Sequence, residues 1–177
     1  MTDGTTTIAG LTIPSANPVF LSVVALHILL GVTSALSGAL AMLSRKAPGR
    51  HPRFGTVYFW STTAIFISVS ILSVMRWSED YHLFVLGALS FTAAFVGRCA
   101  RRRRFVGWAR VHITAMGSSY VLLLTAFYVD NGKQLPLWRD LPVWSYWVLP
   151  ALAGIPLILR ALLRHPVARG IPDTVSR

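Results

Sequence analysis

The run VFLSVVALHILLGVTSALSGALAMLS, residues 19–44, is apolar along its length and contains no Asp, Glu, Lys or Arg. A helix rises about 1.5 Å per residue, so this run is long enough to cross a hydrocarbon layer about 30 Å thick. Four further uncharged, mostly apolar runs follow it, at 54–75, 81–97, 111–129 and 141–159. The sequence therefore predicts five transmembrane helices.

The composition agrees with this prediction. Of the 177 residues, 54% are hydrophobic and 13% are charged, whereas a soluble domain usually carries about 25% charged residues. We therefore expect an all-α integral membrane protein with a single transmembrane domain over 18–164. A flexible external tail is predicted over 1–17 and a flexible cytoplasmic tail over 165–177.

The cations are divided unevenly between the two sides of this predicted path. Of 17 Lys and Arg, 14 fall within 45–53, within 98–110 or beyond residue 159. These segments are the first connection, the third connection and the C-terminal end, which share one side if the chain crosses five times. Cytoplasmic loops carry the excess of Lys and Arg. The sequence therefore predicts a protein of the cell inner (plasma) membrane, with its N-terminus outside the cell and its C-terminus in the cytoplasm.

The net charge of +11 could suit a nucleic-acid ligand, but its position at the ends of apolar runs favours the membrane surface. Each cation near an anionic surface contributes about 1 kcal/mol. We expect lipid headgroup contacts from the densest cluster: Arg101, Arg102, Arg103 and Arg104. The predicted partners are an anionic bilayer and either a membrane protein or a second copy of the chain, and no nucleic acid.

Small residues recur on the first four runs, at spacings of three and four on the first and at heptad spacing on the second, and they are scarce on the fifth. Such residues let helix backbones approach closely inside a membrane. The sequence therefore predicts a four-helix bundle plus one peripheral helix. We expect a polar face within this bundle, carrying Ser34, Ser119 and Tyr120.

Four histidines lie in or beside the first four predicted helices: His27, His51, His82 and His112. Ionisable groups within a membrane span are costly and therefore mark candidate functional sites, and imidazole is a frequent haem ligand. The topology predicts that His27 and His82 share the outer half, and that His51 and His112 share the inner half. The structural alternative is a hydrogen bond from each imidazole to a neighbouring helix.

Depth along the helices argues against simple pairing. Counted from Pro18, His27 lies about 13 Å into the layer, whereas His82 lies only a few Å in. Both predicted pairs are mismatched in this way. A single site using His27, or His112 with Met116 one turn further along, is easier to build.

Three histidine-containing segments carry a family resemblance: HILLGVTSALSGAL, HPRFGTVYFW and RVHITAMGSSY. They resemble a family of small bacterial membrane proteins known as a domain of unknown function. That family is similar in its first-helix histidine, its His-Arg-x-x-Gly start to the second helix and its His-x-x-x-Met-Gly segment in the fourth. The matching residues, within residues 20–130, are His51, Gly55, His112, Met116 and Gly117, with Pro52 interposed before Arg53. The family is uncharacterised, so the resemblance implies no activity.

One histidine on each of four successive helices also resembles the di-haem transmembrane cytochromes b. This pattern suggests a haem-binding electron-transfer component that carries haem b, with His27 and His112 as preferred ligands and His51, His82 and Met116 as further candidates. The alternative is a non-catalytic small-solute or proton pathway, or an assembly partner of a membrane complex. The sequence shows no hydrolytic or transferase site, so whether the protein is an enzyme is left open.

Overall fold

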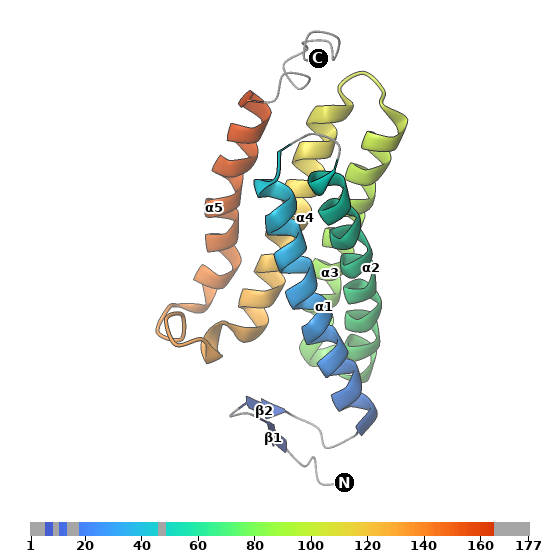
Figure 1. Ribbon diagram of the computed structural model, residues 1–177. Helices are drawn as coiled ribbons and strands as arrows, with labels where there is room; N and C mark the ends of the chain where they lie inside the picture. Colours follow the sequence, from blue (N-terminus) through green and yellow to red (C-terminus); the bar gives the residue numbers. More distant parts are fainter. Residues whose placement is uncertain (1–5, 9–10, 14–17, 46–48, 165–177) are drawn as a thin grey trace. The chain divides into compact units, whose positions relative to one another are not determined.

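The computed structural model describes residues 6–8, 11–13, 18–45 and 49–164. Long helices dominate this part of the chain (Figure 1). They are α1 (Pro18–Leu43), α2 (Arg50–Met75), α3 (Trp77–Arg103), α4 (Trp108–Asn131) and α5 (Val143–Arg164), with a 3-10 turn, η1 (Gly132–Gln134), after α4. All five long helices are apolar enough and long enough to cross a membrane. The five predicted apolar runs are therefore confirmed as helices.

The helices extend beyond the apolar runs at their basic ends. The second helix begins at Arg50 rather than at residue 54, and the third continues to Arg103 rather than stopping at residue 97. Arginine is a good helix former, and proline is tolerated in a first helical turn, so neither the Arg run nor Pro52 ends a helix. His51 consequently lies in the first turn of α2, not before it.

Two short strands occupy part of the segment predicted as a flexible external tail. They are β1 (Thr6–Ile8) and β2 (Leu11–Ile13), which pair antiparallel with Thr6 opposite Ile13. The flexibility and the side of this segment stay predictions. The tail predicted over 165–177 lies outside the described residues.

The chain divides into two compact units. The first unit contains α1, α2, the start of α3 as far as Phe84, and residues 133–139. The second unit contains the rest of α3, α4 and α5. The predicted four-helix bundle would draw on both units, and it stays a prediction.

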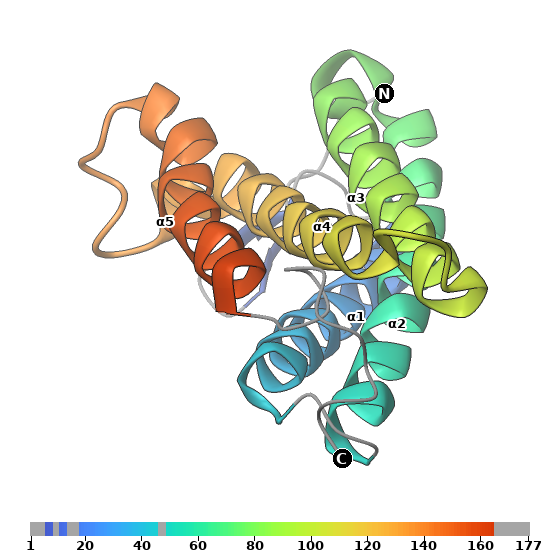
Figure 2. The same cartoon turned by 90° about the horizontal axis from the view of Figure 1, so that it is seen from above.

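In the first unit, α1 and α2 lie side by side and antiparallel (Figures 1 and 2). Midway along them, the hydroxyls of Ser34 and Thr62 are 2.8 Å apart, and both side chains are fully buried. At the turn into α3, the Ser73 hydroxyl donates to the Asp80 carbonyl oxygen at 3.2 Å. Small hydroxyl side chains therefore hold the contacts between successive helices.

In the second unit, α4 and α5 pack through two glycines, one on each helix. A Cβ atom on Gly117 would lie 2.5 Å from Cγ1 of Ile158, and one on Gly154 would collide with Cγ2 of Val121. Each glycine thus admits a branched side chain of the other helix. The predicted peripheral helix is packed tightly on α4, through one of the few small residues that its sequence offers.

Unlike those of a water-soluble protein, the described helices expose many large apolar side chains, while both apolar and small polar side chains are buried between them. Large apolar side chains face outward along the helices, with Leu29 66%, Val74 77% and Leu163 72% exposed. The buried polar side chains in the described part of the chain are all hydroxyls: Ser34, Ser37, Ser61, Thr62, Ser68, Ser73, Ser90, Ser119, Thr125 and Ser145. The helices therefore bury small polar groups against one another and present leucine, isoleucine and valine to their surroundings.

Candidate functional site

His27, in the middle of α1, contacts α2 through Ser68. Its Nδ1 atom lies 2.8 Å from the Ser68 hydroxyl oxygen, and that hydroxyl donates to the Ile65 carbonyl oxygen at 2.9 Å. A hydroxyl has one proton to donate. Ser68 uses it toward Ile65 and therefore accepts the Nδ1–H of His27. This arrangement leaves the lone pair of the neutral imidazole on Nε2.

His51 and His112 each donate to a backbone carbonyl of the preceding helix. Nδ1 of His51 lies 2.8 Å from the carbonyl oxygen of Ala41, near the end of α1, and Nδ1 of His112 lies 2.8 Å from the carbonyl oxygen of Gly97 on α3. A carbonyl oxygen only accepts hydrogen bonds, so both rings carry their hydrogen on Nδ1. His51 and His112 thus make the same kind of contact, from one helix back to the helix before it, whereas His27 contacts a hydroxyl of the following helix.

The His-x-x-x-Met-Gly segment of α4 forms a joint between three helices. His112 bonds the Gly97 carbonyl oxygen. Met116, one turn along, lies over the same glycine, because a Cβ there would be 2.8 Å from Met116 Cγ and 2.9 Å from its Sδ. The next residue, Gly117, admits Ile158 of α5. Each named residue of the segment therefore serves a packing contact, and the thioether of Met116 lies within one of them.

His82 lies near the start of α3, partly exposed beside the ring of Tyr81 with ring centroids 5.7 Å apart. The Ser73–Asp80 hydrogen bond fixes the level of α3 against α2. Measured from that bond along the helix axes, His82 lies about 3 Å further along α3. Ser68, the partner of His27, lies about 7.5 Å back along α2. The two imidazoles differ in level by about 4.5 Å.

This offset bears on the predicted haem. Two axial nitrogens on one iron must meet it from opposite faces at nearly one level, so His27 and His82 fit poorly as a pair. The other predicted pair, His51 and His112, has one member in each unit and stays a prediction. Within residues 6–8, 11–13, 18–45 and 49–164, no three His, Cys, Asp or Glu side chains cluster closely enough to hold a metal ion.

The predicted polar face consists of contacts that are local to each unit. Ser34 pairs with Thr62. The Ser90 hydroxyl donates to the Ser119 carbonyl oxygen at 2.9 Å and lies 3.3 Å from the Ser119 hydroxyl. Tyr120 is partly exposed on α4. Along α1, the His27 and Ser34 contacts lie about 10 Å apart. These two described contacts therefore do not form a continuous hydrogen-bonded chain.

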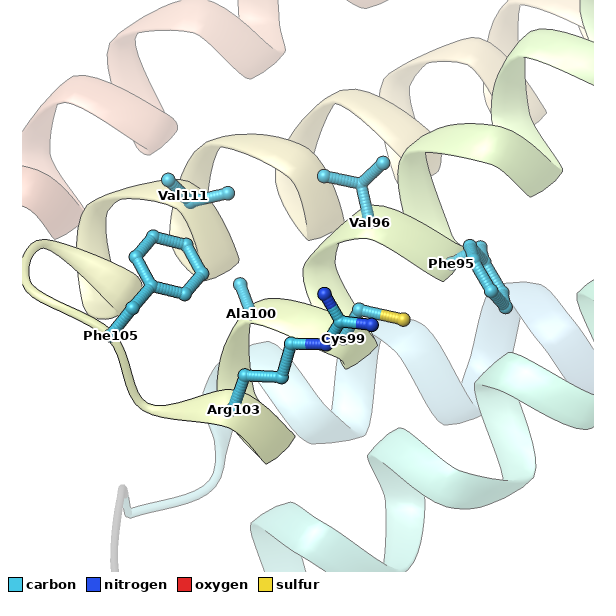
Figure 3. Close-up of a pocket in the computed structure, with 7 residues that line it drawn as sticks. All are labelled: Phe95, Val96, Cys99, Ala100, Arg103, Phe105 and Val111. Atoms are coloured by element: carbon cyan, nitrogen blue, oxygen red, sulfur yellow. The ribbon is translucent and has the colours of Figure 1, made fainter.

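The predicted arginine cluster lies at the turn from α3 to α4. This turn uses left-handed backbone at Arg104, with φ of 46°, and at Gly107, with φ of 82°. The guanidinium of Arg104 lies over the ring of Trp108, 5.9 Å from its centroid. The tight geometry turns Phe105 back toward the helices (Figure 3).

Next to this turn is a pocket of about 240 Å³ (Figure 3). Its lining residues are Phe95, Val96, Cys99, Ala100, Arg103, Phe105 and Val111. Of the predicted arginine cluster, only Arg103 lines it. Sequence reasoning missed the other lining residues, because the pocket depends on how α3 meets α4. The signal that could have found it is the apolar run FVG placed directly after four arginines.

No family model matches the chain, and no curated protein or solved structure resembles it at a significant level.

Proposed function

We propose that the chain is a multi-pass protein of the cell inner membrane, with its N-terminus outside and its C-terminus in the cytoplasm. Two independent features support this location. The outward-facing side chains of the helices are large and apolar, which water disfavours and lipid does not. The arginines gather at alternate connections, as the positive-inside rule requires of a cytoplasmic side.

Within the membrane, the geometry supports best a non-catalytic role as an assembly partner of a membrane complex. The observation that carries this proposal is the use of the imidazoles. His27 pairs through Nδ1 with the Ser68 hydroxyl of the following helix, and His51 and His112 each donate Nδ1–H to a carbonyl oxygen of the preceding helix. The histidines that the sequence singles out as candidate ligands therefore form hydrogen bonds between helices. The transport version of this role has less support, because the hydroxyl contacts along α1 are separated.

A point of attachment for a partner helix is offered by Gly31, in the middle of α1. A Cβ atom there would meet nothing within 4 Å, and neighbouring Val32 is 54% exposed. Glycine in a membrane span lets another backbone approach closely. This side of α1 is therefore suited to a second transmembrane helix.

The test is the size and composition of the complex extracted from native membranes in mild detergent. We expect a defined complex larger than the chain with its detergent, which Gly31→Leu dissociates by filling the approach. Val32→Leu is the control, since it places the same leucine side chain at an exposed neighbouring position that already carries a large apolar group, and it should leave the complex intact. A monodisperse monomer in wild type would contradict the proposal.

A second candidate, a b-type haem component, is favoured by one specific observation. A ligating histidine usually donates its other ring N–H to an oxygen, and all three bonded histidines hold that tautomer. His27 or His112 would hold such a haem through Nε2, and the group would supply one-electron transfer. Against this, the described pair His27 and His82 is offset in level, and Met116 is engaged in packing.

One optical spectrum separates the two candidates. Protein purified from haem-replete cells should be colourless if the histidines are structural. A Soret band that is lost on His27→Ala or His112→Ala would favour the haem component. If the histidines are structural, added hemin should give no spectrum of protein-bound haem.

A further inference from the structure

We propose that the pocket at the turn from α3 to α4 binds one anionic phospholipid, with the lipid phosphate on Arg103 and the start of an acyl chain against the apolar wall. This inference rests on the proposed membrane location and adds a specific site to it. The walls come from the end of α3, the turn and the first residues of α4 (Figure 3).

The shape of the pocket suits a ligand with one charged and one apolar part. Ala100 is buried, while Phe95, Val96 and Phe105 are about half exposed around the opening. Arg103 supplies the single charged side chain, and Figure 3 shows its guanidinium group extending over Cys99. A guanidinium group matches phosphate oxygens with two parallel hydrogen bonds. The neighbouring aromatic and branched side chains suit an acyl chain.

The charge pattern around the pocket calls for an anionic ligand. Residues 81–129 and 143–164, which span most of α3, most of α4 and all of α5, contain no Asp or Glu. The surrounding segment 98–110 instead carries six arginines: Arg98, Arg101, Arg102, Arg103, Arg104 and Arg110. This excess of positive charge favours a ligand that carries negative charge. Basic pockets at the cytoplasmic ends of membrane helices bind lipid phosphate in this way.

A lipid fits this site better than a free anion, because the phosphate-binding and apolar surfaces are continuous. A free phosphate would leave the apolar wall exposed at the interface. The turn supports the same arrangement, since left-handed backbone at Arg104 and Gly107 holds Phe105 at the edge of the pocket. The site thus combines one cation with a preformed apolar surface.

The chain provides its own reporter, because Cys99 is its single cysteine and lines the pocket. The experiment measures the rate of alkylation of delipidated, detergent-solubilised protein by N-ethylmaleimide. Phosphatidylglycerol is expected to slow the reaction about fivefold relative to phosphatidylcholine, the factor that one additional cation–phosphate contact gives. Glycerol phosphate, which has the headgroup charge and no chains, should give no protection.

Two variants distinguish a site from diffuse surface charge. Arg103→Gln should reduce the protection by phosphatidylglycerol to within twofold of phosphatidylcholine. Arg102→Gln removes the same charge from an exposed position one residue away that does not line the pocket, and it should retain full protection. Both side chains are exposed, so folding should not be affected.

Three results would overturn the inference: equal protection by both lipids, equal loss in the two variants, or protection by glycerol phosphate alone. Failure of the proposed membrane location is detected separately, by release of the expressed protein from membranes in a carbonate wash. A protein that stays in the membrane and shows no lipid preference would remove the lipid site while leaving the membrane location in place.

Discussion

Single side chains set the distance between α4 and α5, and Gly154 is the most restrictive of them. Leucine at this position would collide with Val121, because its Cβ atom would overlap Cγ2 of that residue. We expect Gly154→Leu to lower the free energy of unfolding by about 1–3 kcal/mol, the usual cost of overpacking. Thermal unfolding in detergent, followed by Trp fluorescence, measures the change.

The control for this prediction is Ala153→Leu, because Ala153 is exposed on the adjacent position and should tolerate the larger side chain. The double variant Gly154→Leu with Val121→Ala should recover part of the lost stability, since the two residues share one contact. Equal destabilisation by the variants at 153 and 154 would contradict the packing described for this pair.

The bond between His27 and Ser68 gives a second prediction at the scale of residues. A double-mutant cycle with His27→Ala and Ser68→Ala should give a coupling energy of about 0.6 kcal/mol, the typical value for hydrogen bonds between membrane helices. Stability in detergent is the measurement. A coupling near zero would mean that the contact does not hold α1 to α2. An accompanying change in visible absorption would instead favour the haem component.

At the scale of elements, the turn between α3 and α4 depends on Gly107, whose φ of 82° lies in the left-handed region. Side chains with a Cβ adopt this conformation at a cost of about 1 kcal/mol. Gly107→Ala should therefore reduce the free energy of unfolding by about that amount. Val106→Ala, at a fully exposed neighbouring position, should change it little. A matched loss in both variants would show that the turn tolerates no change at all, rather than requiring glycine.

The elements themselves could be predicted from the sequence, because an uncharged run of 17 or more apolar residues has few alternatives to a membrane helix. Their contacts could not. The acceptor for His112 is a backbone carbonyl fifteen residues earlier, and a carbonyl leaves no trace in a sequence pattern. Met116 was a reasonable ligand candidate by residue type, and only the register of α3 against α4 reveals its contact with Gly97.

The pocket illustrates the same limit. The sequence predicts lipid headgroup contacts from all four arginines of the cluster, whereas in the structure only Arg103 of the four lines the pocket. Helical periodicity could have separated them. The position of Phe105 could not be derived, because it follows from the left-handed backbone at Arg104, an unusual conformation for that residue type.

At the scale of the whole molecule, the proposed orientation makes a direct prediction. Fusion of green fluorescent protein after Arg164 should give fluorescent cells, because green fluorescent protein folds in the cytoplasm and not after export. Fusion of alkaline phosphatase within residues 135–139 should give active enzyme, because phosphatase requires export. The reverse pattern would overturn the orientation and place the arginine cluster outside.

Each hydrogen bond between helices described here joins helices that are consecutive along the chain. The acceptors on α1 and α3 lie on the helix made just before their histidine donors, and Ser68 lies on the helix made just after His27. During synthesis, a polar side chain would thus find its partner as soon as the next span leaves the ribosome. The nascent chain could therefore enter the bilayer as successive hairpins. An imidazole would not be exposed to lipid without its hydrogen bond while a distant segment was still being made.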